Sequence, residues 1–401
     1  MESAKQNRFI IVLEKCLGIS GNQLKGLMRK LTSNLGIDVM NILVLNYEYP
    51  PIGGGGAAVT KELCNKISEH GNQVDVVTMG FKELPSIEKK DNVTVHRVKC
   101  WRTKQRVCHP WEQLSYCIRA YKYIVKELEI TKYDFIHCHF IIPTGLVALF
   151  LKKKYGIRYI LTAHGSDVIG HNNDRFSLLY KVITPGWKKI VRNASIITAP
   201  SQYLVNKIHQ TVSDVEVELV PNGINVSDYY YSEKKKSLIT LTRLQKSKGV
   251  QDLINACAEL DLNGWEINIL GDGPYRGELE KIVREKNMAE KVRFRGHVEG
   301  DERMKYLSQA GGFFSGSRFE AFSLSVLEAS LCGCNIIATN IEPHVLLVGE
   351  EHTYASENEL KKKLETLFTS DPLNYEYKNE RYDWENIYLM YDSLYCRMRN
   401  E

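Results

Sequence analysis

Two carboxylates, Glu320 and Glu328, lie in a segment that joins a loop to the start of a helix. The apolar run before them, residues 311–314, predicts a buried strand, and residues 336–339 predict the next one. Glu320 therefore falls on a strand-to-helix loop, whereas Glu328 lies on the helix about two turns further along. A second acid on such a helix is suited to holding the vicinal hydroxyls of a ribose or sugar. Two solvated surface glutamates explain the spacing alone more simply.

The start of the same helix offers a site for an anion. Phe322, Ser323 and Leu324 would present free backbone N–H groups there, and the helix dipole adds positive potential. Ligands of α/β proteins bind at the carboxyl ends of parallel strands, where such loops lie. The sequence therefore predicts a phosphate near these amides.

Two cations follow the first strand of the second half of the chain. Residues 237–241 predict that strand, Arg243 follows its end, and Lys248 opens the next helix. A planar guanidinium and a compact ammonium at these places are suited to binding a diphosphate. Two solvated bases remain the simpler explanation of their spacing alone.

A glycine-rich segment, residues 50–56, follows the first predicted strand. No Gly-Lys-Ser/Thr follows it, so it is not a Walker loop, and it lacks the spacing of a dinucleotide fingerprint. Its four successive glycines, Gly54 and Gly55 among them, indicate close approach to the backbone. A tight turn and a ligand site explain this equally well.

The elements that must position these residues alternate between strand and helix from residue 40 onward. Such alternation is typical of a doubly wound parallel sheet, and a strong turn signal near 221–223 separates two sets. We therefore predict an α/β protein with two Rossmann-like domains joined near 212–222. The predicted strands of the first set are 42–46, 74–78, 93–98, 135–138, 159–162, 196–198 and 215–220. Those of the second are 237–241, 265–270, 291–295, 311–314 and 336–339.

Composition and charge narrow the class of protein further. The net charge of +5 combines +13 in residues 1–215 with −8 in residues 216–401. The basic half either favours an anionic surface or acceptor or supplies solubility charge alone. The ten cysteines show no metal or disulfide spacing, which suits a reducing cytoplasm. The longest apolar run, 140–151, is too short to span a bilayer.

One basic and aromatic segment suggests where an anionic surface could bind. Residues 97–106 carry five bases and no acid, and a predicted helix follows from Trp111. Ile118, Tyr121 and neighbouring apolar residues form a stripe at three- and four-residue spacing. We predict that this stripe is the core face of a Rossmann helix. Membrane docking by the basic loop stays open beside a purely structural role.

Seven motifs occur in an order and at spacings that resemble those of the family-4 retaining glycosyltransferases of GT-B fold. The motifs are Pro-Pro-x-x-Gly-Gly at 50–55, Asp-Phe-Ile-His-Cys-His at 134–139, Thr-Ala-His-Gly-Ser-Asp at 162–167, Pro-Asn-Gly-Ile at 221–224, Arg-Leu…Lys-Gly at 243–249, Gly-Asp-Gly-Pro at 271–274 and Glu320…Glu328.

The resemblance implies roles for residues of the second half. Arg243 and Lys248 would bind the donor diphosphate and offset charge on the departing nucleotide. Glu320 would lie beside the transferred sugar, Glu328 would hold the ribose hydroxyls, and the amides of 322–324 would bind the donor. Stabilising a leaving group with fixed cations requires no metal ion.

Further roles follow for the remaining motifs. His164 would be a catalytic-site residue that touches the donor sugar from the first domain, and Gly273 would lie on the donor side. Gly54 and Gly55 would line the cleft near the acceptor and the phosphates. His139 is a candidate acceptor contact, although a histidine satisfied at a strand end is the simpler interpretation.

The resemblance covers about residues 40–395 and implies a domain organisation. We expect an acceptor-binding domain at 40–215, a nucleotide-sugar-binding domain at 216–375 and a C-terminal helix, 376–401, that packs back on the first domain. Residues 1–39 are either an appended extension or a genuine N-terminal helix.

The expected activity is metal-independent, retaining transfer of a hexosyl unit from a UDP- or GDP-sugar to a glycan, glycolipid or small hydroxyl acceptor. The nucleotide sugar is a co-substrate, and no cofactor is expected. We expect a cytoplasmic protein, with contact at the inner face of the membrane as an option, and no nucleic-acid partner. A non-catalytic GT-B partner subunit and a UDP-sugar epimerase are the alternatives. Residues 342–345 differ from the glycine-bearing segment that is usual at this place in the family and that normally lies near the donor. The identity of the donor is therefore the property that the resemblance predicts least well.

Overall fold

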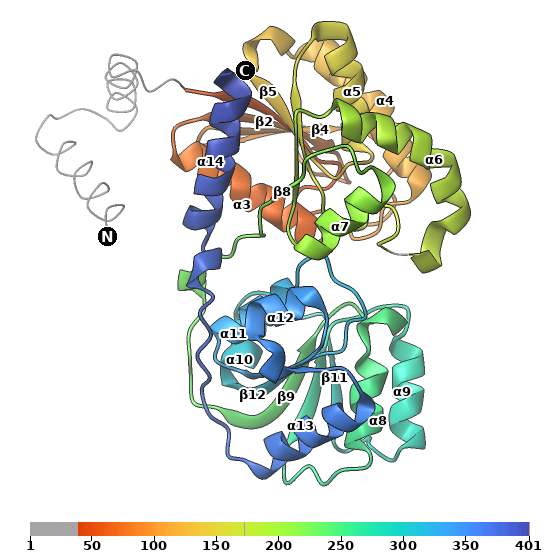
Figure 1. Ribbon diagram of the computed structural model, residues 1–401, viewed down its shortest axis with the longest axis vertical. Coiled ribbons are helices and arrows are strands. Elements are labelled where there is room, and N and C mark those ends of the chain that lie inside the picture. The colour runs from red at the N-terminus through yellow and green to blue at the C-terminus, as the bar shows by residue number, and fades with distance from the viewer. Residues whose placement is uncertain (1–38, 172, 401) are drawn as a thin grey trace, which may run out of the picture.

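The computed structural model describes residues 39–171 and 173–400. The predicted extension at 1–39 therefore lies outside the described residues except for its last residue. Two α/β domains follow one another along the long axis of the molecule, and the C-terminal helix lies beside the first domain (Figure 1). This arrangement confirms the predicted GT-B architecture.

The first sheet has eight strands in the order β3-β4-β2-β1-β5-β6-β7-β8. All neighbouring strands are parallel except β3 and β4, which are antiparallel. The central strands are buried on both faces, as their nearly continuous apolar sequences require. The strands are β1 (Asn41–Leu45), β2 (Gln73–Met79), β3 (Ile87–Lys90), β4 (Val93–Val98), β5 (Phe135–His139), β6 (Tyr159–Thr162), β7 (Ile196–Ala199) and β8 (Glu218–Leu219).

Helices cover both faces of this sheet and create two separate cores. Residues of α3 (Gly55–Glu69) and α14 (Trp384–Asn400) pack in the core on one face. The opposite core receives residues from the other helices of the domain. These helices are α4 (Pro110–Glu127), α5 (Thr144–Tyr155), α6 (Asn173–Asn193) and α7 (Gln202–Thr211).

The second sheet has six strands, all parallel, in the order β11-β10-β9-β12-β13-β14. Two cores flank it, one formed with α8, α9 and α13 and the other with α10, α11 and α12. The strands are β9 (Lys235–Leu241), β10 (Glu266–Leu270), β11 (Val292–Gly296), β12 (Ala310–Ser315), β13 (Asn335–Thr339) and β14 (Thr353–Tyr354). The helices are α8 (Val250–Cys257), α9 (Arg276–Glu285), α10 (Gly300–Gln309), α11 (Leu324–Leu331), α12 (Glu342–Val348) and α13 (Glu357–Thr369).

The chain crosses between the domains twice, and the two crossings pair with each other. Ile224, on the outward crossing, forms a bridge with Asp383 on the return. The Ile224 amide donates to the Tyr382 carbonyl at 2.8 Å, and the Trp384 amide donates to the Ile224 carbonyl at 3.0 Å. Helix α14 then packs against α3 of the first domain (Figure 1).

Most predicted strands are present, and the misses are short or peripheral elements. The sequence patterns did not indicate the exposed edge strand β3 or the two-residue strand β14. The predicted strand at 215–220 is reduced to β8, which pairs in the first sheet up to Leu219. Polar or very short segments carry too little periodicity to be recognised.

The predicted core face of α4 was partly right, because Tyr121, Val125 and Leu128 pack against the first core. The residues of this helix that are buried include Tyr116, Ala120 and Ile124, whereas Ile118 is half exposed and Tyr121 only partly buried. The buried row of Tyr116, Ala120 and Ile124 and the predicted row from Ile118 both have helical spacing, so periodicity alone could not select the more buried one. Trp111, Leu114 and Ile118, in the amino-terminal half of α4, remain exposed on the surface.

Gly223 allows the two crossings to lie together, and its replacement tests their importance. A Cβ atom there would lie 2.4 Å from the Trp384 ring. We expect Gly223→Ala to destabilise the protein by about 1–3 kcal/mol, as overpacking of a buried contact does. Thermal unfolding of purified protein measures the effect.

Gly277→Ala is the matched control, because no atom lies within 4 Å of a Cβ atom at that position in α9. It should be neutral or stabilise by up to about 1 kcal/mol. Equal unfolding temperatures for Gly223→Ala and the wild type would show that the contact is not tight.

Candidate functional site

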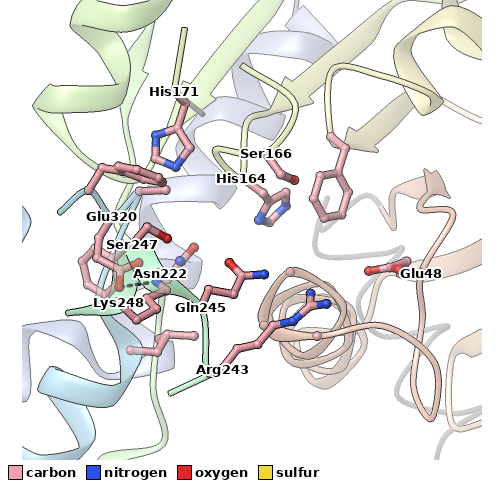
Figure 2. Close-up of a pocket in the computed structure, with 18 of the residues that line it drawn as sticks. Glu48, His164, Ser166, His171, Asn222, Arg243, Gln245, Ser247, Lys248 and Glu320 are labelled. Atoms are coloured by element: carbon pink, nitrogen blue, oxygen red, sulfur yellow. Dashed lines mark hydrogen bonds and ion pairs between the residues drawn. The ribbon is translucent and has the colours of Figure 1, made fainter. Parts of the chain in front are cut away.

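A cleft of about 390 Å³ lies between the two domains, with both contributing to its walls. The first domain supplies Glu48, the glycine-rich loop and His164, and the second supplies Arg243, Lys248 and Glu320 (Figure 2). Each group follows the carboxyl end of a parallel strand, where loops of an α/β sheet converge. The structure thus brings together residues that are up to 272 positions apart in the sequence, from Glu48 to Glu320.

Glu320 and Lys248 form an ion pair on one side of the cleft. The Lys248 Nζ donates to Glu320 Oε1 at 2.6 Å, and the Ser317 hydroxyl donates to the same oxygen at 2.7 Å. Burial opposes ionisation of Glu320, but Lys248 and Ser317 outweigh it and hold the pKa of this carboxyl below its ordinary value. Glu320 is therefore a fixed carboxylate at neutral pH, and Lys248 is a fixed cation beside it.

Arg243 lies in the cleft on the segment that follows β9, and two glycines of the next loop support this segment. A Cβ atom at Gly271 would lie 1.9 Å from the Thr242 carbonyl oxygen, and one at Gly273 would lie 2.3 Å from that of Leu244. The predicted donor residue Gly273 does not line the cleft. Its position provides close backbone packing behind Arg243.

The amino end of α11 faces the cleft as predicted. Phe322 and Leu324 line the cleft, and Ser323 is the residue that precedes the first turn of the helix. The Ser323 side chain is buried, and its hydroxyl has no hydrogen-bond partner among the described residues. The backbone N–H groups at this end are placed to receive an anion.

Glu328 lies apart from the residues that line the cleft. Its side chain is almost fully buried, where it forms an ion pair with Arg303 and accepts a hydrogen bond from the Tyr229 hydroxyl at 3.2 Å. The predicted contact with ribose hydroxyls therefore requires a ligand that reaches beyond the cleft toward α11, or a rearrangement of this pair.

His164 lines the cleft from the loop after β6, and a buried carboxylate holds that loop in place. Asp167 accepts from the backbone N–H of His164 at 2.9 Å and from that of Ile141 at 2.6 Å. Burial raises the pKa of Asp167 to about 6, although these amides favour its charged form. Burial also lowers the pKa of His164 to about 3, so its imidazole is neutral at pH 7.

His139, predicted as an acceptor contact, is fully buried and does not line the cleft. Its Nδ1 lies 3.1 Å from Nε2 of His164, so it stands directly behind the residue that does face the cleft. The position of His139 supports an indirect role in place of the predicted one.

The glycine-rich loop is closely packed at Gly53 and Gly56 and open at Gly54. Gly54, Gly55 and Gly56 line the cleft, and a Cβ atom at Gly56 would lie 2.6 Å from the Phe140 ring. Helix α3 begins at Gly55 without a side-chain cap, so its first N–H groups face the cleft unprotected by a capping residue. The structure thus combines the two explanations, a packed turn and a ligand-facing loop.

Glu48 is a cleft residue that the sequence motifs did not identify. It follows β1 and forms an ion pair with the fully buried side chain of Arg102 at 2.8 Å. Burial raises the pKa of Glu48, although Arg102, Arg243 and the Gly54 amide oppose the shift. An acid directly after a buried strand and before a glycine-rich loop was the available signal.

Two of the five bases of the segment 97–106 have structural roles, and the other three are exposed. Arg97 and Arg102 are buried, and Arg97 pairs with Glu88 at 2.8 Å. Arg106 lines the cleft and reaches the second domain, where it pairs with Glu299 at 2.6 Å. This pair and the nearby His297 bridge the domains at the edge of the cleft.

Four further polar residues, which were not predicted as site residues, complete the cleft. His171, Asn222, Gln245 and Ser247 all line it. Asn222 belongs to the predicted turn, and Gln245 and Ser247 lie between Arg243 and Lys248, so only His171 lacked any sequence signal. Within the described ranges, no three or more His, Cys, Asp or Glu side chains are grouped to hold a metal ion.

Family models match the chain in two consecutive blocks. Glycosyltransferase Family 4 matches residues 53–228, and Glycosyl transferases group 1 matches residues 228–384. The boundary between the matches falls at the first crossing between the domains. Together with the fold and the paired domains, they show that this chain is a glycosyltransferase of the family-4, GT-B group.

Individual relatives agree with this assignment at low identity. An uncharacterized glycosyltransferase of Methanocaldococcus jannaschii is 25% identical over 369 residues, which cover 89% of this chain and 98% of that protein. The N-acetyl-alpha-D-glucosaminyl L-malate synthase of Bacillus anthracis is 26% identical and covers 75% of this chain and 80% of its own length. The Anabaena protein HepE, solved with UDP-glucose, superposes with a TM-score of 0.68 at 17% identity, covering 89% of this chain and 100% of that one.

Removing the cation beside Glu320 should lower both the activity and the stability of the protein. We expect Lys248→Ala to lower glycosyl transfer about 100-fold or more, the usual effect of losing one charge-stabilising group. It should also cost about 2 kcal/mol of stability, because the partly buried carboxylate of Glu320 loses a charged hydrogen-bond donor. Transfer assays and thermal unfolding measure the two effects.

Adding Glu320→Gln to Lys248→Ala should restore most of the stability but not the activity. Lys246→Ala, on the same turn but exposed to solvent, is the matched control and should change neither. Near-normal turnover of Lys248→Ala would remove this lysine from the reaction.

Proposed function

We propose that this chain transfers a hexosyl unit from a UDP- or GDP-sugar, with retention and without a metal ion, to a glycan, glycolipid or small hydroxyl acceptor. The observation that carries the proposal is the convergence of Arg243, Lys248 and the amino end of α11 on one side of the cleft. Two cations and free amides are the donors that a diphosphate binds.

The same groups would assist the departure of the nucleoside diphosphate from the sugar. Cleavage of the sugar–phosphate bond places negative charge on the nucleoside diphosphate and positive charge on the anomeric carbon. Arg243 and Lys248 would stabilise the first charge without the need for a metal ion. The carboxylate of Glu320, kept ionised by Lys248, would stabilise the second. Attack of the acceptor on the face that the phosphate leaves gives retention.

The first domain would bind the acceptor and orient the sugar. Glu48, the glycine-rich loop and His164 face the cations across the cleft (Figure 2). The UDP-glucose in the Anabaena protein supports a uridine nucleotide sugar as donor. The sugar and malate in the name of the Bacillus anthracis synthase support a hydroxyl acceptor of small size.

A non-catalytic subunit is the second candidate function, and the residues of the cleft disfavour it. Arg243, Lys248 and Glu320 are all present and meet in one cleft. The matched families and the named relatives are glycosyltransferases rather than epimerases.

Slow hydrolysis of donors in the absence of acceptor tests the proposal. The purified protein is incubated with UDP-, GDP- and ADP-sugars, and the released nucleotide is measured by mass spectrometry. We expect one UDP- or GDP-sugar to turn over, with equal rates in the presence of EDTA because Arg243 and Lys248 supply the positive charge. Glu320→Gln should lower that rate about 100-fold or more.

Dependence on an added divalent cation would contradict the metal-independent mechanism. Nucleotide binding without turnover of any donor, even when simple glycosides are added as acceptors, would favour the non-catalytic subunit.

We also propose that the first domain contacts an anionic membrane through an exposed face. The face consists of apolar side chains on α4 and its neighbours, Trp101, Trp111, Leu114, Ile118 and Phe150, which are 50–69% exposed. Trp111, Leu114 and Ile118 share one side of α4. The Trp101 backbone N–H donates a hydrogen bond to the hydroxyl of Ser115, on α4, at 3.1 Å. This bond holds the loop that carries Trp101 beside the helix.

The positive charge of the side chains around this face favours an anionic lipid surface as its partner. Exposed Arg119, Lys122 and Lys126 lie on the same helix, and Lys153 and Lys154 end α5 beside it. Aromatic side chains surrounded by bases are typical of interfacial membrane contact. No helix in the described part of the chain is both long and apolar enough to cross a bilayer.

Vesicle sedimentation tests this surface. We expect binding to vesicles rich in phosphatidylglycerol and weak binding to pure phosphatidylcholine. The double variant Trp111→Ser, Leu114→Ser should bind about 100-fold less, since each side chain contributes about 1.5 kcal/mol on leaving water and every 1.4 kcal/mol is about ten-fold in affinity. Leu373→Ser, an equally exposed position in the second domain, is the control. Unchanged binding by the double variant would exclude this face.

A further inference from the structure

Three histidines form a continuous stack inside the first domain. The rings of His137 and His139, both on β5, have centroids 4.5 Å apart, and those of His139 and His164 are 5.3 Å apart. His137 and His139 are fully buried, whereas His164 is partly exposed and lines the cleft. The stack therefore leads from the core to the cleft.

The inner end of the stack is fixed by hydrogen bonds. The Nδ1 of His137 lies 2.9 Å from the hydroxyl of Tyr395 on α14, and its Nε2 lies 2.8 Å from the hydroxyl of Thr162. Both of its nitrogens therefore have partners. His139 differs, because only its Nδ1 has a partner, which is His164 Nε2 at 3.1 Å. Its Nε2 is buried without a hydrogen-bond partner among the described residues.

All three rings are neutral at pH 7. Burial lowers the pKa of His137 and of His164 to about 3, and burial together with the other two rings also holds the pKa of His139 well below its ordinary value. A neutral imidazole carries one proton, so one of its nitrogens donates and the other accepts. The contact between His139 and His164 thus has two possible proton arrangements.

The buried nitrogen of His139 decides between the two arrangements. If His164 donated from Nε2, the proton of His139 would sit on its own Nε2, where no acceptor lies within reach in the described structure. Orphaned buried N–H groups are rare, because they lose a hydrogen bond to water without replacing it. If His139 donates from Nδ1 instead, only a lone pair remains without a partner.

We infer that His139 is a positioning residue that fixes His164 as the tautomer protonated on Nδ1. No hydrogen bond within the described residues uses that nitrogen, and the ring lies on the side of the cleft opposite Arg243 (Figure 2). His164 then presents an N–H group to the cleft. It donates a hydrogen bond to an oxygen of the bound substrate and has no lone pair there with which to remove a proton.

The identity of that substrate oxygen rests on the proposed function, in which it belongs to the donor sugar or the acceptor. The tautomer itself does not depend on the activity. The two can therefore be tested separately.

Nitrogen NMR of the protein labelled with ¹⁵N-histidine tests the tautomer directly. Long-range ¹⁵N–¹H spectra distinguish rings protonated on Nδ1 from rings protonated on Nε2, and the spectrum of His164→Gln identifies the signals of His164. We expect the Nδ1-protonated form at pH 7 without any substrate. A ring protonated on Nε2, or a charged ring, would overturn the inference whatever the protein catalyses.

His139→Leu tests the positioning role. It removes the donor to His164, so we expect mixed tautomer signals from His164 and about a ten-fold lower kcat/KM for the donor. Tyr395→Phe is the control, since it removes a hydrogen bond at the far end of the stack without touching His164. It should leave both the tautomer and the rate unchanged. Unchanged His164 signals in a folded His139→Leu would refute the role.

Discussion

The cleft depends on one constraint, the pairing of the two chain crossings at Ile224 and Asp383. Backbone hydrogen bonds join the segments, and the Trp384 ring lies where any side chain at position 223 would collide with it. Two paired connections restrict twisting more than a single linker, whereas relative domain motion is the usual expectation for a small interface. The Arg106–Glu299 pair at the edge of the cleft adds a bond that solvent and salt can weaken. The backbone amide of Tyr203, which donates to Glu342 at 3.1 Å, makes a further contact between the domains.

The two walls of the cleft differ in their electrostatics. The second domain presents charge, with Arg243 and the ion pair of Lys248 and Glu320. The first domain presents His164, which burial keeps uncharged, Glu48, whose pKa burial raises, and at the edge Arg106, whose charge is paired with Glu299. Such a division suits a reaction in which one wall receives a developing anion and the other orients hydroxyl groups. It also means that the cations need not compete with nearby cationic histidines.

Much of the fold and part of the cleft could be predicted from the sequence, because buried parallel strands produce long apolar runs. Arg243, Lys248 and Glu320 follow such strands, but it was the order of the family motifs that selected them, since their spacing alone fits solvated charges at least as well. Glu48 and His171 were not found, since no motif marks them and only the folded chain brings them to the cleft. Glu328 was placed on the correct helix, but its partner Arg303 comes from a different one, which helical spacing cannot reveal. On α4, Ile118 was wrongly assigned to the core, because Tyr116, Ala120 and Ile124 form a second row of helical spacing that takes the most buried positions.

The helix α14 belongs to the core of the first domain, where Tyr388, Tyr391 and Tyr395 are buried against β1 and α3. During synthesis on the ribosome, domains generally fold in order from the amino end. Here the first domain lacks part of its core until the whole second domain has been made. The part of one sheet face that α14 covers beside α3 therefore stays exposed for that interval. The second domain, whose cores contain no residues from the first, has no comparable delay.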